Sequence, residues 1–322
     1  MRFLKRLGTA CLLVVAFGAT VEAVRLEKIN YGDFSHWITR HIKESGMIGG
    51  KTKTIYAIGP TYTINEAVPY RPSGGTPWAT SNVYAKVSGI TKASGTVTPF
   101  DRGGGNMCAK METVLEEVKV AGVVNMKVVV PGTIYFGQVF EPITNTKNPY
   151  GKMEMGLPYT KRPTCLVYDY KVTIPNGNVK HHGNGLGNPK TINGKDECEV
   201  YVLLQRRWED SKGNIYAKRV GTGRERFSQS SNGWVNGHQL PIHYGDITGK
   251  SFYKPYMGLL DGSKAYYARN SKGKLMPVHE IGWDSADATP THVLVMMSSG
   301  SGEAYVGTIG NTLYVDNVAF GF

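Results

Sequence analysis

Short β-patterned segments recur along the chain, and most of them end at glycine, proline or asparagine. Apolar and polar residues alternate from Leu166 to Ile174, which is typical of a strand with one buried face. Thr291–Ser299 is apolar on both faces, as in a central strand between two layers. The 40 glycines among 322 residues supply the turns that such a chain needs. We therefore predict an all-β protein, an antiparallel sandwich or barrel with minor helices.

The pattern also predicts where individual elements lie. Ser35–Gly46 is expected to form a short helix, with Trp37, Ile38 and Ile42 on one side. Val123–Val130 and Thr133–Phe140 are expected to form a hairpin about Pro131-Gly132. Further strands are predicted at Thr54–Ile58, Thr61–Ile64, Ser81–Val87, Cys198–Arg207, Ile215–Val220, His238–Tyr244 and Asn311–Phe320.

The first 23 residues have the features of a secretory signal. Arg2, Lys5 and Arg6 precede an apolar run that is too short to span a membrane, and Val21-Glu22-Ala23 suits signal peptidase. Cys11 lies within the apolar run instead of after it, which argues against a lipoprotein. We expect a secreted or periplasmic protein with no membrane span. Residues 24–322 show no repeat and no linker, and are predicted to be a single domain.

The formal net charge is +12, which favours acidic partners. The densest basic patch comprises Arg206-Arg207, Lys218-Arg219, Arg224 and Arg226. Nucleic acid is not expected, because no nucleic-acid-binding motif is present and the chain carries an export signal. An acidic glycan such as a uronate polymer remains a hypothesis.

Three cysteines follow the signal, namely Cys108, Cys165 and Cys198. An odd number cannot form a complete disulfide framework. One disulfide is possible after export, but buried small apolar side chains are the commoner interpretation.

Tryptophan rings can stack on the apolar faces of sugars. Four of them lie near turn-rich segments, where ligand sites usually form. The alternative for each is a ring that fills the end of a sandwich core. The candidate carbohydrate-binding residues are Trp78, Trp208, Trp234 and Trp283.

A glycoside hydrolase would need two carboxylates that flank the scissile bond. The sequence does not set the distance between any two of its carboxylates, and solvated surface groups are the alternative for each. The candidates are Asp169, Asp196, Glu197, Glu199, Asp246, Asp284 and Glu303.

The C-terminal part carries a family resemblance. Pro290-Thr291-His292 opens an apolar strand that ends at Ser298-Ser299, and Gly307–Val318 follows with Thr312-Leu313-Tyr314-Val315-Asp316. This pattern resembles the putative carbohydrate metabolism domain family of bacterial exported proteins. The resemblance implies a jelly-roll sandwich like those of carbohydrate-binding modules, and members are often described as glycoside hydrolases or xylanases. It supplies no catalytic pair.

A second likeness concerns calcium. Some carbohydrate-binding jelly rolls hold a structural calcium between an early Asn-Gly-Asp-Phe-like turn and an Asp on the last strand. Here Asn30–Phe34 contains Asp33, and Asp316 lies near the C-terminus. Carboxylates and turn carbonyls are suitable calcium ligands. The alternative is a turn and a capping carboxylate with no metal, since Tyr31 is inserted in the motif.

Together these features predict an exported protein that binds or processes a polysaccharide and requires no cofactor. Two alternatives are a glycoside hydrolase that uses a carboxylate pair, and a structural or adhesive surface protein with a protein partner.

Overall fold

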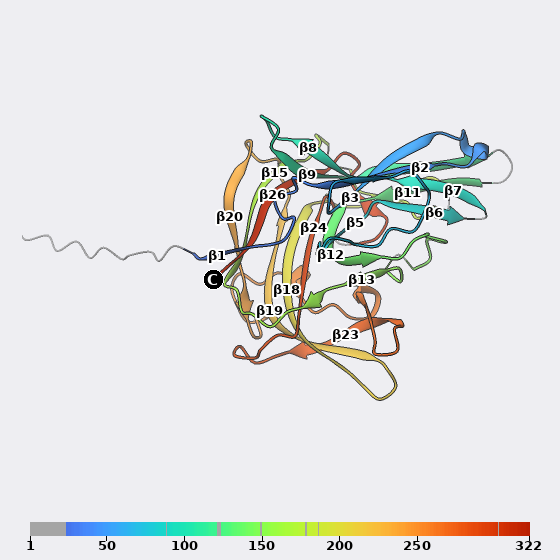
Figure 1. Cartoon of the computed structure of the whole chain (residues 1–322). Helices are drawn as coiled ribbons and strands as arrows, with labels where there is room; N and C mark the ends of the chain where they lie inside the picture. Colours follow the sequence, from blue (N-terminus) through green and yellow to red (C-terminus); the bar gives the residue numbers. More distant parts are fainter. Residues whose placement is uncertain are drawn as a thin grey trace, which may run out of the picture.

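The computed structural model describes residues 24–322 except 88, 121–123, 149, 178, 186 and 302. The predicted signal, residues 1–23, lies outside the described residues. The regular structure of the described part consists of β-strands and three single-turn 3₁₀ helices (Figure 1), which confirms the all-β prediction. The 3₁₀ helices are η1 (Gly46–Ile48), η2 (Pro255–Met257) and η3 (Gly262–Lys264).

The first sheet is antiparallel and has the order β20-β15-β26-β9-β8, with β1 added beside β26. β15 and β26 are paired along most of their length, with one register shift between Val167 and Asp169. The strands are β1 (Leu26–Lys28), β8 (Val97–Asp101), β9 (Met107–Glu112), β15 (Cys165–Thr173), β20 (Val235–Pro241) and β26 (Thr312–Gly321).

The second sheet has the order β14-β24-β18-β19-β23-β22-β13-β12-β5, with β21 beside β19. Because β12 also pairs with β24, the hydrogen-bonded path returns on itself. The strands are β5 (Trp78–Thr80), β12 (Thr133–Val139), β13 (Met153–Met155), β14 (Leu157–Pro158), β18 (Cys198–Glu209), β19 (Ile215–Phe227), β21 (His243–Tyr244), β22 (Tyr267–Arg269), β23 (Leu275–Trp283) and β24 (His292–Ser298).

The two sheets form a sandwich, because the main strands alternate between them. The chain passes from β9 in the first sheet to β12 in the second, then to β15 in the first and β18 in the second, as expected for a jelly roll. Leu166 of β15 and Val315 of β26 pack in one buried cluster with Val200 of β18 and Val295 of β24. This cluster is the sandwich core.

The second sheet is also covered on its other face. Successive side chains of a strand point to opposite faces. Val293, Val295 and Met297 of β24 therefore enter the sandwich core, while Leu294 and Met296 join a second buried cluster. The prediction that Thr291–Ser299 is a central strand between two layers is confirmed.

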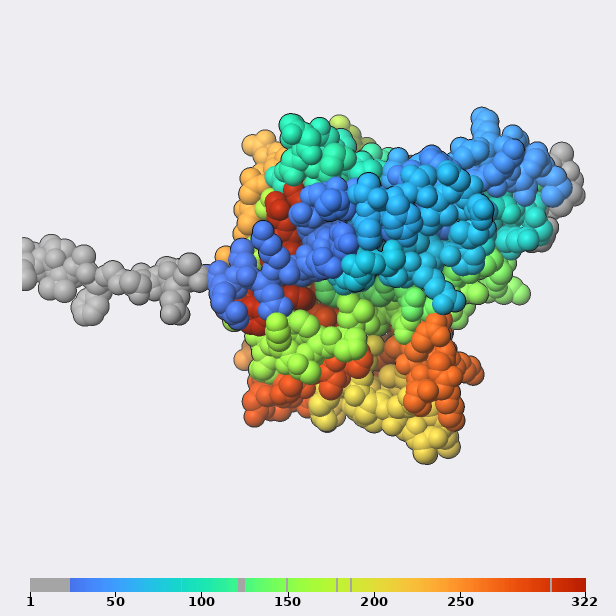
Figure 2. Space-filling model, in the orientation of Figure 1, coloured from blue at the N-terminus to red at the C-terminus, as the bar shows by residue number. Residues whose placement is uncertain are grey.

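Smaller sheets extend the molecule beside the sandwich, where β2, β6, β7 and β11 point to one side (Figure 1). In the space-filling view the N-terminal segments, blue to cyan, lie against the green middle of the chain (Figure 2). The strands are β2 (Trp37–Lys43), β3 (Thr52–Ile58), β4 (Tyr62–Ile64), β6 (Val83–Val87), β7 (Ile90–Ser94), β10 (Val114–Val120), β11 (Val124–Val130), β16 (His181–His182), β17 (Lys190–Thr191) and β25 (Val306–Gly307).

A buried carboxylate connects this extension to the second sheet. Glu141, just after β12, accepts hydrogen bonds from both terminal nitrogens of Arg40 on β2 at 3.1 and 2.7 Å. It also accepts from the backbone N–H groups of Tyr70 and Tyr84, each at 2.9 Å. Both side chains of the ion pair are at most 1% exposed. The arrangement pairs a charge that would otherwise be costly to bury.

Two local predictions are wrong. The segment expected to be a helix forms β2, in which Ile38, Arg40 and Ile42 are buried on one face. A strand can bury Arg40 on the same face as the two isoleucines because Glu141, from a distant part of the chain, neutralises its charge.

The expected hairpin about Pro131-Gly132 is also absent. β11 pairs with β10, and β12 pairs with β5, β13 and β24. Gly132 instead lies tightly against β9, where an added Cβ would be 2.4 Å from the Glu112 nitrogen. Only glycine permits this close approach of two backbones.

The cysteine interpretation agrees with the structure. Cys108, Cys165 and Cys198 are buried and free.

Replacing Glu141 tests the connection between the extension and the second sheet. Glu141→Gln places an amide N–H₂ among donors and leaves Arg40 buried without a counter-charge. We expect the free energy of unfolding in urea to fall by about 3–5 kcal/mol. Glu117→Gln, at a side chain that is 37% exposed, should leave it nearly unchanged. Equal effects of the two substitutions would contradict the assignment.

Acid should destabilise the protein partly through His292. Burial, followed by the charge of Arg207, lowers the pKa of His292 from 6.5 to about 4. Between these values the unfolded chain takes up a proton that the native state does not, so the free energy of unfolding falls as the pH decreases from about 6.5 to 4. Urea titrations across this range should show a smaller decrease for His292→Gln than for the unchanged protein. Parallel pH profiles would refute the prediction.

Candidate functional site

A pocket of about 500 Å³ lies at the face of the second sheet that is turned away from the sandwich core. β19 contributes Arg224 and Arg226, and the chain around η2 and η3 contributes Tyr256 and Tyr266. Ser301, Glu303 and Ala304 form another part of the wall. We call this the cationic pocket.

The register of β18 and β19 places the arginines at this face. Glu199 lies opposite Arg226, and Tyr201 lies opposite Arg224, so all four side chains share one face of the hairpin. Val200 and Val202 alternate with them and point into the sandwich core.

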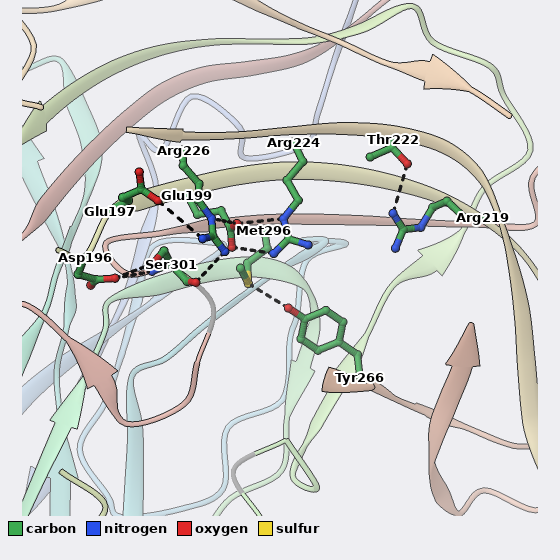
Figure 3. Close-up of polar contacts among 10 residues, drawn as sticks. All are labelled: Asp196, Glu197, Glu199, Arg219, Thr222, Arg224, Arg226, Tyr266, Met296 and Ser301. Carbon is green, nitrogen blue, oxygen red and sulfur yellow. Dashed lines mark hydrogen bonds and ion pairs between the residues drawn. The ribbon is translucent and has the colours of Figure 1, made fainter. Parts of the chain in front are cut away.

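Glu199 holds both arginines, as Figure 3 shows. Arg224 donates from Nε and Nη2 to the two carboxylate oxygens at 2.9 and 3.1 Å. Arg226 donates from Nε to Oε1 at 2.7 Å. Glu199 is completely buried, and one carboxylate thus serves two guanidinium groups. The cluster retains positive charge.

Arg224 has an unused donor. Its side chain is 5% exposed, and its Nη1 has no hydrogen-bond partner among the described residues. Burial acts to lower the pKa of Arg224, but the charge of Glu199 outweighs it and raises the pKa above the ordinary value. The guanidinium therefore stays charged. It lies 5.0 Å from the ring centre of Tyr201.

The charged side chains that line the pocket are mainly positive. Lys180 and Lys264 line it with the two arginines, and Glu303 is the lining carboxylate among the described residues. Glu197 lies 3.7 Å from Nη1 of Arg226. Tyr256 covers Arg226, with the guanidinium 4.4 Å from its ring centre, and thereby limits its movement. The pocket can receive an anion in surroundings partly removed from water.

Trp78 is placed differently from the expectation. It has no exposed surface, packs against Phe34 and Phe136, and donates from Nε1 to the Asn30 carbonyl at 3.1 Å. A ring enclosed in this way cannot stack on a sugar. The alternative interpretation, a ring that fills the sandwich core, describes it correctly.

The other three tryptophans lie apart from the residues that line the cationic pocket. Trp208 is 38% exposed and stacks on Tyr216 across the β18–β19 hairpin. Trp234 is half-buried beneath the guanidinium of Arg102, 3.9 Å from its ring centre. Trp283 is half-buried near Arg219. Their roles in carbohydrate binding stay predictions.

The candidate carboxylates mostly have structural partners. Asp196 accepts hydrogen bonds from Ser301 and from the backbone of Thr308, and Asp284 pairs with Arg206. Asp246 accepts from Thr248 within its own turn. Glu303 lines the pocket, whereas Glu199 is occupied by the two arginines.

The geometry does not fit a calcium ion shared by Asp33 and Asp316. Asp316 is completely buried, and its Oδ2 accepts from Nη1 of Arg102 at 2.6 Å. Asp169 accepts from the same nitrogen at 2.9 Å. Asp33 is exposed and accepts a hydrogen bond from the backbone of Ser35. Across the described residues, no three His, Cys, Asp or Glu side chains come together as a metal site.

Only some of the pocket's main residues could be identified from the sequence. Arg224 and Arg226 belong to the basic patch noted there, and their spacing by two residues on a strand could have indicated a shared face. Tyr256, Lys180 and Lys264 come from irregular segments far apart in the sequence. No local pattern marks them.

Comparison with known families decides the affiliation. The model of the family described as "Putative carbohydrate metabolism domain" matches residues 53–239, more than half of the chain. The chain belongs to this family. A carbohydrate-related role follows from this membership, and the predicted resemblance is confirmed. The matched range does not include the C-terminal pattern of residues 290–318 from which the resemblance was inferred.

Two solved structures are similar over much of the chain. One, described as a putative glycoside hydrolase from Bacteroides thetaiotaomicron, has 18% identity and a TM-score of 0.44, covering 84% of this chain and 75% of its own. Another with the same description, from Bacteroides vulgatus, has 13% identity and a TM-score of 0.43, covering 92% and 94%. Such similarity does not transfer an activity. No curated protein matches the sequence significantly.

None of the helices in the described part of the chain has the length and apolar character to cross a membrane.

Chelation tests the calcium hypothesis. We expect the melting temperature to be the same with and without EGTA, because Arg102 already supplies the positive charge beside Asp316. Differential scanning calorimetry of the mature chain measures this. A lower melting temperature in EGTA that is restored by added calcium would contradict the expectation.

Proposed function

We propose that this protein binds an acidic carbohydrate, such as a uronate-containing glycan, in the cationic pocket. The observation that carries the proposal is Arg224. It lines the pocket beside Arg226, whose side chain is 19% exposed, and Glu199 fixes both guanidinium groups. Pre-oriented arginine donors are suited to carboxylates, to which they form strong charge-assisted hydrogen bonds.

The surroundings of Arg224 support the same ligand. Lys180, Arg226 and Lys264 add positive charge around the cavity, and Tyr256 and Tyr266 add hydroxyl groups and ring surface. Sugar hydroxyls need polar partners, and sugar rings pack on aromatic side chains. The family membership supports a carbohydrate over other anions. The net positive charge of the chain also favours an acidic ligand.

Binding is proposed in preference to hydrolysis because of the carboxylates. A glycosidase needs one carboxyl group as an acid and a second as a base or nucleophile. Among the described residues Glu303 lines the pocket, and Glu199 is engaged by two arginines. Glycoside hydrolysis remains the alternative function, and the experiment must distinguish it from binding alone.

Native affinity electrophoresis tests the proposal. We expect the mature chain to be retarded in gels that contain polygalacturonate or alginate more than in gels that contain neutral glucans. Lys264→Glu and Arg226→Gln should each weaken retardation by about tenfold or more in apparent Kd, as expected for loss of a charged contact. Added salt should weaken it too, since exposed charges are screened.

The control is Lys212→Glu, at the exposed tip of the β18–β19 hairpin, which makes the same charge change as Lys264→Glu outside the pocket lining. It should leave retardation nearly unchanged. Equal losses in both lysine variants would indicate a nonspecific charge effect and would contradict the site. Release of reducing ends from a retarding polymer would favour the hydrolase alternative.

A further inference from the structure

A second cavity adjoins the cationic pocket and differs from it in chemistry. It has a volume of about 290 Å³ and is lined mainly by apolar side chains. Its walls come from two separate hairpins, β6–β7 and β10–β11, and from the face of the second sheet. We call it the apolar cavity. Its hairpin side chains include Val83, Ala85, Ile90, Val118, Met126 and Val128.

Two of the charged residues that line this cavity, Lys92 and Glu116, are paired within the protein. Lys92 pairs with Glu44 at 3.2 Å and with Glu116 at 3.5 Å. Thr133 and Ser298 hydrogen-bond to each other at 2.9 Å. What remains is an apolar space, and apolar cavities stay dry and accept apolar molecules. Its volume is close to the lower end of ligand pockets, about 300 Å³.

Tyr135, which lines the cavity, carries a buried polar group. The hydroxyl of Tyr135 has no hydrogen-bond partner among the described residues, and the side chain is completely buried. Burial raises the pKa of this hydroxyl, so it keeps its proton. An unpaired buried donor of this kind costs stability.

The two spaces are adjacent. Tyr150, Tyr266, Glu303 and Ala304 line both of them. The cationic pocket on one side of this boundary suits an anion, and the apolar cavity on the other suits a hydrocarbon. A single ligand that occupied both would need an acidic head and an apolar tail.

We propose that the protein binds an amphiphile, an acidic saccharide with an acyl or alkyl chain, whose chain enters the apolar cavity between β6–β7 and β10–β11. For its polar half this inference rests on the proposed function. For its apolar half it rests on the chemistry of the cavity and on the lining that it shares with the cationic pocket. It changes the substrate class from a plain polysaccharide to a glycolipid.

The test uses three glycosides, each titrated calorimetrically below its micellar concentration. Octyl β-D-glucuronide has the acid and the chain, methyl β-D-glucuronide has the acid alone, and octyl β-D-glucoside has the chain alone. We expect the octyl glucuronide to bind at least about tenfold more tightly than the methyl glucuronide, because burial of two methylene groups is already worth that factor.

Filling the cavity should remove this difference. Val118 lines the cavity, so Val118→Trp should abolish the advantage of the octyl chain and leave the affinity for methyl glucuronide unchanged. The matched control is Lys119→Trp, the next residue of β10, whose side chain is 62% exposed on the other face. It should retain the octyl advantage.

A butyl glucuronide provides a second measurement that needs no variant, and its affinity should lie between those of the methyl and octyl compounds. Equal affinities for the methyl, butyl and octyl glucuronides would overturn the inference and leave the proposed function intact. An octyl advantage that persists in Val118→Trp would also overturn it, because the chain would then bind elsewhere.

Equal binding of the two octyl compounds without binding of methyl glucuronide would support the cavity and contradict the proposed acidic-carbohydrate function. Binding of none of the compounds would overturn both.

Discussion

A single carboxylate, that of Glu141, joins parts of the chain that lie far apart in the sequence. It neutralises Arg40 of β2 and accepts from the backbone at Tyr70 and Tyr84. Because Tyr84 belongs to β6, the same group fixes the hairpin that forms one wall of the apolar cavity. The position of that cavity against the second sheet therefore depends in part on an ion pair that lies outside the cavity lining.

The second sheet has buried layers on both faces, so each charge that faces inward must be paired. Arg219 and Glu280 are both completely buried in such a pair, and Arg224 and Glu199 form another. The two pairs differ in their surroundings. Arg219 also donates to Thr222, whereas Nη1 of Arg224 has no hydrogen-bond partner among the described residues, and Arg224 lines the cationic pocket. In the proposed function, the pairing that makes burial of Arg224 possible also holds it in position for an anion.

Local sequence patterns correctly predicted several of the structural elements. The alternation in Leu166–Ile174 and the continuous apolar run of Thr291–Ser299 identified β15 and β24. Burial of a strand leaves a recognisable pattern of apolar residues in its sequence. β2 was predicted to be a helix. In the sequence Arg40 resembles a solvent-exposed position, because the distant partner that allows its burial is not known at that stage. Trp78 was assigned to a ligand site because composition does not distinguish a core ring from an exposed one. The cationic pocket unites β19 with irregular segments, and only long-range register brings these together.

The closed hydrogen-bonded path of the second sheet has a consequence for a chain so rich in strands. An open sheet ends in strands whose unpaired N–H and C=O groups can capture another molecule. Here the pairing of β12 with β24 closes a ring from which only β14, β5 and β21 branch, so the strands within the ring have neighbours on both sides along part of their length. The connectivity thereby limits edge-to-edge self-association through the strands of this ring.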